Sequence, residues 1–218
     1  AAAHVVPALA GVLHAIARAV LELDAGGGQA EAVPDDGTVG GITLHVHQRE
    51  ALRRVRGAIL EFGGALLADE PGLGKTFVAL ALAREYPHTL VAAPAALRDV
   101  WREASARAGV ATAFVSLERL SRRDAGDAGG AGGRAALLIV DEAHHACHPR
   151  TARYARLARL AAGARVLLLS ATPVRNRRAE LHALLALFLG PRAGSLDGAA
   201  RSRCIIRRTG SVARLPAI

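Results

Sequence analysis

Lysine and methionine are nearly missing from this sequence. The chain of 218 residues has no methionine, and Lys75 is the one lysine in a total of 28 lysine and arginine residues. Alanine and arginine are abundant instead, the bias expected of a GC-rich genome. Because composition excludes lysine everywhere else, its presence at position 75 indicates that the glycine-rich segment around it requires this side chain.

Cysteines and long apolar runs are also scarce. Cys147 and Cys204 lie far apart in a chain with no export signal, which argues against a disulfide framework and favours reduced thiols. The apolar stretch at residues 5 to 23 is interrupted by proline, histidine and charged side chains, so we expect no membrane span and no secretory signal. These absences predict a cytoplasmic protein.

Acidic and aromatic residues are the remaining scarce classes. The formal net charge is +9, which favours a polyanionic partner because each cation that neutralises a phosphate releases condensed counterions. Aromatic residues make up only 3% of the chain, so contact with a phosphate backbone is favoured over stacking on bases. The genome bias leaves open that any single arginine is ordinary solvated surface.

The length suits one α/β domain with a small appendage. Residues 1–24 carry apolar positions at helical spacing and predict an amphipathic helix, and the Gly-, Asp- and Pro-rich residues 25–41 predict a linker. Residues 42–218 are then predicted to form the main domain. A chain that begins at Ala1 without methionine is expected to be a piece of a longer polypeptide.

Short apolar runs alternate with helical patterns through the main domain. Strands are predicted at 65–68, 89–93, 112–116, 136–140 and 166–170, and helices at 47–61, 75–85, 95–108, 151–162 and 179–189. Apolar strands separated by helices predict a parallel sheet covered on both faces, the α/β class. Ligands of such sheets bind at the carboxyl ends of the strands.

The first of those ends carries a phosphate-binding motif. Gly72-Leu73-Gly74-Lys75-Thr76 follows a strand and opens a helix, where main-chain N–H groups cradle phosphates. Lys75 is predicted to reach the β- and γ-phosphates of ATP, and the Thr76 hydroxyl to bind Mg²⁺. Asp69 stands where the common pattern has its first glycine. Asp69 and Leu73 are included with Gly72, Gly74, Lys75 and Thr76 among the residues predicted to bind the nucleotide.

Two later strand ends complete the predicted site. Asp141 and Glu142 follow an apolar strand, and such a pair can divide the work, with Asp141 holding Mg²⁺ and Glu142 activating the attacking water. Ser170 and Thr172 lie at the end of the next strand and are predicted to relay the state of the γ-phosphate. The cluster His144, His145, Cys147 and His148 suggests zinc, but one short turn rarely supplies four tetrahedral ligands.

The ordered motifs resemble those of superfamily-two helicases. They comprise residues 44 to 50, 68 to 76, 141 to 145 and 170 to 173. Within that superfamily the chain is most similar to Swi/Snf-type helicase-like ATPases with a DEAH box, a branch that includes the bacterial RNA-polymerase-recycling ATPase. Pro94 followed by Trp101 and Glu103 supports this branch, and the resemblance extends over residues 44 to 216.

The resemblance implies a RecA-like P-loop lobe that pairs with a second RecA-like lobe to translocate on double-stranded DNA. It implies that Gln48 contacts adenine and that His144 joins the coupling residues. It also implies that arginines after the second and third strands, among them Arg98 and Arg119, contact the nucleic-acid backbone. The family has methionine where Pro71 stands, and proline removes one backbone N–H from the loop.

Three functions stay open on the sequence alone. One is a translocase or remodeller lobe, and the second is a strand-separating DNA or RNA helicase with the same first lobe. The third is a non-hydrolysing, nucleotide-responsive module that docks on RNA polymerase. Lys75, Asp141 and Glu142 argue against the third, because a binding module needs no water-activating acid. Trp101 is interpreted as a core anchor of its helix.

Overall fold

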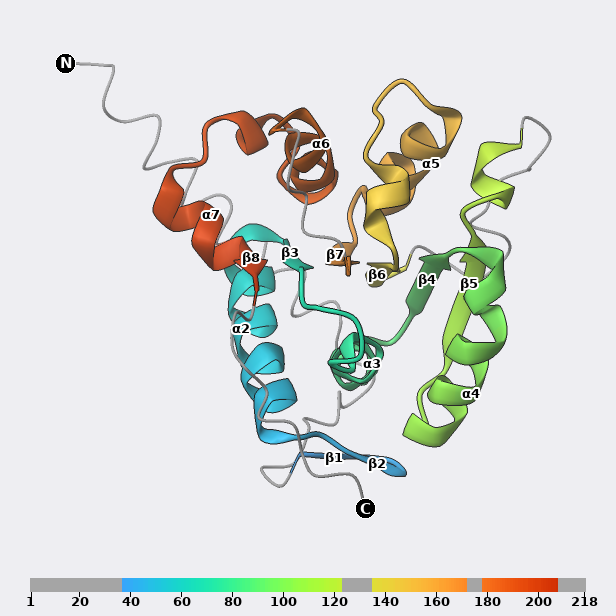
Figure 1. Cartoon of the computed structure of the whole chain (residues 1–218). Helices are drawn as coiled ribbons and strands as arrows, with labels where there is room; N and C mark the ends of the chain where they lie inside the picture. The colour runs from blue at the N-terminus through green and yellow to red at the C-terminus, as the bar shows by residue number, and fades with distance from the viewer. Residues whose placement is uncertain (1–36, 123–134, 172–177, 208–218) are drawn as a thin grey trace. The chain divides into compact units, whose positions relative to one another are not determined.

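A computed structural model describes residues 37–122, 135–171 and 178–207. The helix predicted at 1–24 and most of the linker predicted at 25–41 lie outside these residues. The described residues form an α/β fold whose main sheet has six strands, in the order β5-β4-β6-β7-β3-β8 (Figure 1). All neighbouring strands of this sheet are parallel. The parallel α/β class predicted from the sequence is confirmed.

The strands of the sheet agree closely with the apolar runs. They are β3 (Gly64–Leu67), β4 (Thr89–Ala93), β5 (Thr112–Ser116), β6 (Leu137–Val140), β7 (Arg165–Leu169) and β8 (Ile205–Ile206). Strand β8 was not predicted, because a pair of isoleucines is too short to show a pattern. It adds a sixth, edge strand beside β3.

Helices cover both faces of the sheet. α2 (Val46–Phe62), α3 (Lys75–Ala83) and α4 (Arg98–Ala108) lie on one face, and α5 (Ala152–Ala161) and α6 (Arg178–Leu189) on the other (Figure 1). The short α7 (Gly198–Cys204) is capped by Asp197, whose side chain accepts a hydrogen bond from Ala200 N at 2.7 Å. Single turns of 3₁₀ helix are η1 (Ala95–Leu97), η2 (Arg119–Ser121), η3 (Ala143–Ala146) and η4 (Gly190–Gly194).

The two faces of the sheet hold two separate apolar clusters. Successive side chains of a strand point to opposite faces. In β7, Leu167 and Leu169 pack with α2 and α3, whereas Val166 and Leu168 pack with α5 and α6. All four are fully buried. This double burial explains why β3, β6 and residues 166–169 of β7 are apolar and why both faces need helices.

The folded domain begins before the predicted boundary at Ile42. Residues 37–41, predicted as linker, form β1 (Thr38–Val39) and the turn into β2 (Ile42–Thr43), and Val39 is fully buried. Gly40 has φ +56° and lies against the Ala108 carbonyl, while Gly41 N donates to Arg107 O at 2.8 Å. The glycines therefore serve a tight turn and a close approach to α4, which composition alone cannot distinguish from a linker.

Three loops meet at the carboxyl edge of the sheet. β7 pairs with both β3 and β6, so the segments that follow these strands leave the sheet at the same end. They are the glycine-rich loop, the acid pair and Ser170. Within the described part of the chain, no helix has the length and apolar character needed to cross a membrane.

Gly64 offers a test of this packing. A Cβ atom there would lie 2.7 Å from Phe188 Cβ and 2.8 Å from the Val166 carbonyl oxygen, so Gly64→Ala should lower the free energy of unfolding by about 1–3 kcal/mol. Gly57→Ala is the matched control, because nothing beyond its chain neighbours and its own helix backbone would lie within 4 Å of its Cβ. In helix α2 that change should raise stability by up to ~1 kcal/mol. Equal denaturation midpoints for both variants would contradict the packing.

Candidate active site

The glycine-rich loop joins β3 to α3, as predicted. Gly72 and Gly74 have φ angles of +82° and +73°, which side-chain-bearing residues rarely adopt. Gly74 is the N-cap of α3 and makes no side-chain capping bond. The first N–H groups of a helix have no partner inside the helix and carry the positive end of its dipole. The loop therefore has the form of an anion-binding site.

The Lys75 ammonium lies across this loop. Its Nζ donates to the main-chain carbonyl oxygens of Asp69 at 2.8 Å and Glu70 at 3.0 Å. The side chain is only partly buried. A cation is thus held beside the helix N-terminus, where both would act on the same anion.

Asp141 follows β6 and is a buried carboxylate with a donor on each oxygen. It is 9% exposed, Oδ2 accepts from Trp101 Nε1 at 2.9 Å, and Oδ1 accepts from Glu142 N at 2.9 Å. Burial raises the pKa of Asp141 above its ordinary value. The two N–H donors and Lys75 oppose that rise in pKa, and the Glu142 carboxylate adds to it.

Glu142 is held in a strained backbone conformation. Its φ is +49°, the one positive value at a non-glycine residue within the described ranges. Left-handed non-glycine residues cost about 1–3 kcal/mol and cluster at functional sites, where the surroundings fix them. Here the hydrogen bond from Glu142 N to Asp141 Oδ1 helps to fix the backbone conformation of Glu142. The Glu142 side chain is 31% exposed at this point, and sequence patterns do not reveal the strained conformation.

His144 lies beside this carboxylate. Its Nδ1 is 3.2 Å from Glu142 Oε2, although the two atoms do not meet in hydrogen-bonding geometry. Partial burial lowers the pKa of His144, and His145, whose ring centroid is 4.1 Å away, lowers it further. The carboxylates of Glu142 and Asp141 act in the opposite direction. The net lowering of the His144 pKa favours the neutral imidazole beside Glu142.

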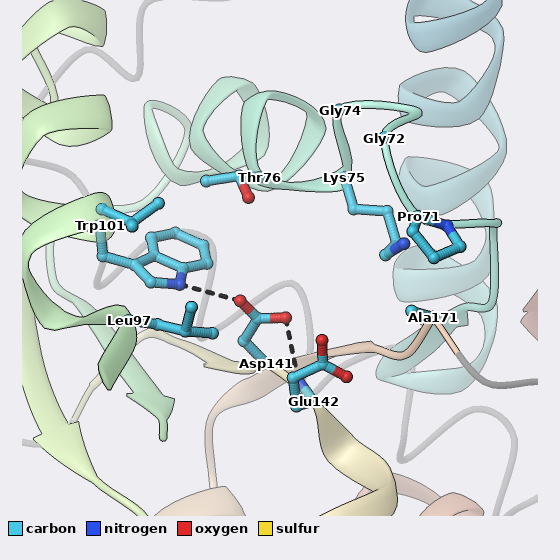
Figure 2. Close-up of a pocket in the computed structure, with 11 residues that line it drawn as sticks. Pro71, Gly72, Gly74, Lys75, Thr76, Leu97, Trp101, Asp141, Glu142 and Ala171 are labelled. Atoms are coloured by element: carbon cyan, nitrogen blue, oxygen red, sulfur yellow. Dashed lines mark hydrogen bonds between the residues drawn. The ribbon is translucent and has the colours of Figure 1, made fainter. Parts of the chain in front are cut away.

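Lys75, Asp141 and Glu142 line one pocket of about 340 Å³. Figure 2 shows the Thr76 hydroxyl, the Lys75 ammonium and the Asp141 carboxylate around the same space. The predicted residues that line it are Gly72, Gly74, Lys75, Thr76, Asp141 and Glu142. The glycine-rich loop and the acid pair, far apart in the sequence, are thus brought together.

Other lining residues were not predicted. They are Pro71, Leu97, Val100, Trp101 and Ala171. Positions 97, 100 and 101 have the spacing of one helical face. That spacing places the three residues on one side of the helix, but it does not indicate that they line a polar pocket.

Three residues predicted to bind nucleotide support the loop from outside the pocket. Gln48 is 5% exposed; its Nε2 donates to Leu73 O at 3.3 Å and its Oε1 accepts from His45 N at 2.9 Å. Asp69 has a fully buried side chain and offers its carbonyl to Lys75. Of the described residues that line the pocket, none is Gln48, Asp69 or Leu73.

The predicted coupling residues are only partly described. Ser170 is 1% exposed and follows β7, where its N donates to Leu67 O at 3.1 Å. It therefore lies between the glycine-rich loop and the acid pair. Thr172 lies outside the described residues.

Arg98 and Arg119 are exposed, as nucleic-acid contacts would be. The Arg98 guanidinium lies 4.6 Å from the centre of the Phe114 ring. Other arginines have structural partners: Arg153 donates to His145 O at 2.8 Å and Arg156 to Leu120 O at 2.9 Å. The exposed pair is thus distinct from arginines that hold loops together.

The histidine and cysteine cluster does not gather as one set. Cys147, His148 and Glu180 bring ligand atoms within 4.8 Å of one another, and His144 and His145 are not part of this group. The Cys147 thiol donates to His144 O at 3.0 Å. The group offers three donors, one fewer than a structural zinc site takes from protein.

The polar groups that line the pocket suit a nucleotide bound with magnesium. A hydroxyl and a carboxylate are the hard oxygen ligands that Mg²⁺ prefers, with water filling its other positions. An ammonium and a helix N-terminus are the partners that phosphates prefer. Thr76, Asp141 and Lys75 therefore fit this ligand by their chemistry.

Comparison with solved structures supports the same fold. The chain is similar to the Sulfolobus solfataricus SWI2/SNF2 ATPase core in complex with dsDNA, with a TM-score of 0.60 and 17% identity over 79% of this chain and 46% of that chain. It is similar to the SWI2/SNF2 ATPase core domain of the same organism with a TM-score of 0.60 and 17% identity, over 84% and 46% of the two chains. No protein-family model and no curated protein matches the chain.

This likeness confirms the predicted resemblance at the level of the fold. The chain has the architecture of a RecA-like lobe, and it spans less than half the length of the two cores that it matches, 46% in each case.

Gln48→Ala tests the role of the glutamine. If Gln48 braces the loop, the variant loses ATP and GTP affinity by the same factor, about tenfold for a buried hydrogen bond worth ~1.4 kcal/mol. Titration of both nucleotides measures this. A loss confined to ATP would contradict bracing and instead support the adenine contact that the resemblance implies.

Proposed function

We propose that this chain is the ATP-binding and ATP-hydrolysing first lobe of a Swi/Snf-type, DNA-dependent ATPase. The observation that carries the proposal is the meeting of Lys75, Thr76, Asp141 and Glu142 around one pocket. A pocket that only bound nucleotide would need the loop and the metal ligand. The added acid, held at a strained strand end, is the group that hydrolysis requires.

Each side chain has a distinct part in the proposed reaction. The loop N–H groups and the Lys75 ammonium bind the phosphates and offset negative charge that develops during transfer. Magnesium, when held by Thr76 and Asp141, would neutralise further charge on the phosphates. The Glu142 carboxylate orients a water molecule and accepts its proton. The His144 imidazole lies beside that carboxylate, with Nδ1 3.2 Å from Oε2, and is proposed to couple the nucleotide state to DNA binding.

We propose double-stranded DNA as the partner. The similar Sulfolobus core is described in complex with dsDNA, and the chain carries a net charge of +9. Arg98 and Arg119 are proposed phosphate contacts because both are exposed. A second RecA-like lobe is proposed to complete the enzyme. Docking on RNA polymerase and a cytoplasmic location remain predictions from the sequence.

Lys75→Ala and Glu142→Gln should separate binding from hydrolysis. The unaltered chain should bind Mg-ATP but hydrolyse it slowly, because a second lobe's arginine finger contributes about 10³–10⁵ in rate. Lys75→Ala should lower nucleotide affinity at least about tenfold, as expected for a charge-assisted bond. Glu142→Gln should keep affinity and lose about 10²–10⁴ of the remaining rate.

Arg53→Ala controls for the loss of one positive charge, since Arg53 is exposed and paired with Glu50 at 2.6 Å on α2. Nucleotide titration and single-turnover phosphate release measure the two quantities. The proposal would be refuted if Lys75→Ala kept its nucleotide affinity. It would also be refuted if the unaltered chain hydrolysed ATP as fast as a two-lobed relative.

Arg98→Ala and Arg119→Ala test the DNA contacts. Each should weaken duplex binding and reduce the slope of log affinity against log salt by ~1, because each removes one phosphate contact. Arg53→Ala again serves as the control and should leave the slope unchanged. Equal slopes of log affinity against log salt in all variants would exclude these arginines as DNA contacts.

Comparing duplex DNA, single strands and RNA as activators of the full-length ATPase distinguishes a translocase from a strand-separating helicase.

A further inference from the structure

Trp101 is the sole tryptophan of the chain and is 1% exposed. It lies in α4 and lines the pocket together with Val100 of the same helix and Leu97, which directly precedes the helix. A core anchor at this position needs only an apolar ring. The indole instead turns its polar edge toward the carboxyl end of β6 (Figure 2).

The indole N–H fixes one oxygen of the acid proposed to hold magnesium. Trp101 Nε1 donates to Asp141 Oδ2 at 2.9 Å, and Glu142 N donates to Oδ1 at 2.9 Å. With one donor on each oxygen, the carboxylate cannot rotate without breaking a bond. Each oxygen keeps a second acceptor position. Those positions are the ones available to a cation or to its bound water.

The bond is strong because of where it lies. A hydrogen bond to an ionised carboxylate is about twice as strong as one between neutral groups. Burial strengthens it further, because little water competes for either partner. Since an indole has a single donor, the whole hydrogen-bonding capacity of Trp101 is committed to Asp141.

The same helix reaches the proposed DNA surface. Arg98 lies one turn before Trp101 on α4 and is exposed. Its guanidinium lies over Phe114 of β5, away from the pocket. Helix α4 thus carries an exposed arginine close to a residue bound to the acid pair.

We propose that Trp101 is a positioning residue that orients the Asp141 carboxylate for magnesium and joins helix α4 to the metal site. This inference rests on the proposed function, in which Asp141 and Thr76 hold the metal.

The direct test replaces the indole N–H without changing the ring's shape. Because Trp101 is the sole tryptophan, biosynthetic incorporation of benzothienylalanine changes only this residue and puts sulfur where the N–H was. Binding of a non-hydrolysable ATP analogue is then titrated with Mg²⁺. The Mg²⁺ concentration for half-maximal binding should rise about tenfold, the factor expected for one lost bond to a charged group.

Two controls separate positioning from stability. Fluorotryptophan keeps the N–H and should leave the Mg²⁺ requirement unchanged. Tyr154→Phe removes another aromatic donor bond, from Tyr154 Oη to Ala183 O at 2.8 Å, away from the pocket. It should also leave the Mg²⁺ requirement unchanged, even where it lowers stability.

Indole fluorescence gives a second readout in the unaltered chain. Its emission comes from Trp101 alone and should change when Mg²⁺ and the analogue are added together, and less when EDTA replaces Mg²⁺. The inference would be overturned if the benzothienylalanine protein had the same Mg²⁺ requirement as the unaltered chain, or if the indole emission did not change with Mg²⁺. In either case, nucleotide binding by the unaltered chain would still support the proposed function. Absence of nucleotide binding in the unaltered chain would overturn both.

Discussion

The parallel pairing of β7 with both β3 and β6 is the constraint on which the site depends. Its register places Leu67 opposite Leu169 and Leu168 opposite Val140, so the strands end nearly level. The glycine-rich loop, Ser170 and the acid pair each follow one of these strands directly. A slip of one residue between β6 and β7 would turn every side chain of a strand to the other face. Because both faces are packed with helices, that slip is strongly opposed.

The apolar character of the sheet also sets the electrostatics of the site. Asp141 follows the fully buried Val140, so its carboxylate begins in surroundings that disfavour charge. The indole N–H, the Glu142 N–H and the nearby Lys75 each compensate part of that cost. The positive φ of Glu142 adds backbone strain at the same point. The stability of the sheet is what allows these unfavourable features to persist at its edge.

Much of the fold follows from local patterns in the sequence. The runs at residues 89–93 and 112–116 coincide with β4 and β5. Strand β4 is largely buried because it lies inside the sheet, whereas β5 is an edge strand that is buried only at its last two residues. The glycine-rich loop was predictable because positive φ angles and a helix start leave few alternatives to glycine. Short elements escaped prediction, among them β1 and β8, because two residues carry no periodicity.

The site was predictable where one motif carries it and not where separate segments meet. Lys75, Thr76 and Asp141 could be named from their motifs. The bond from Trp101 to Asp141 joins residues 40 positions apart, and no local signal distinguishes it from ordinary core packing. Gln48 illustrates the same limit: the sequence marks it for the site, but its partner, the Leu73 carbonyl, depends on how α2 packs on the loop.

The most direct test of the whole account is to locate the metal. Crystals of the full chain grown with Mn²⁺ in place of Mg²⁺ and a non-hydrolysable ATP analogue would reveal the ion by anomalous scattering. The account predicts a peak between the Thr76 hydroxyl and the Asp141 carboxylate, with the phosphates on the loop that ends at Lys75. A peak away from both side chains, or phosphates bound elsewhere on the protein, would contradict it.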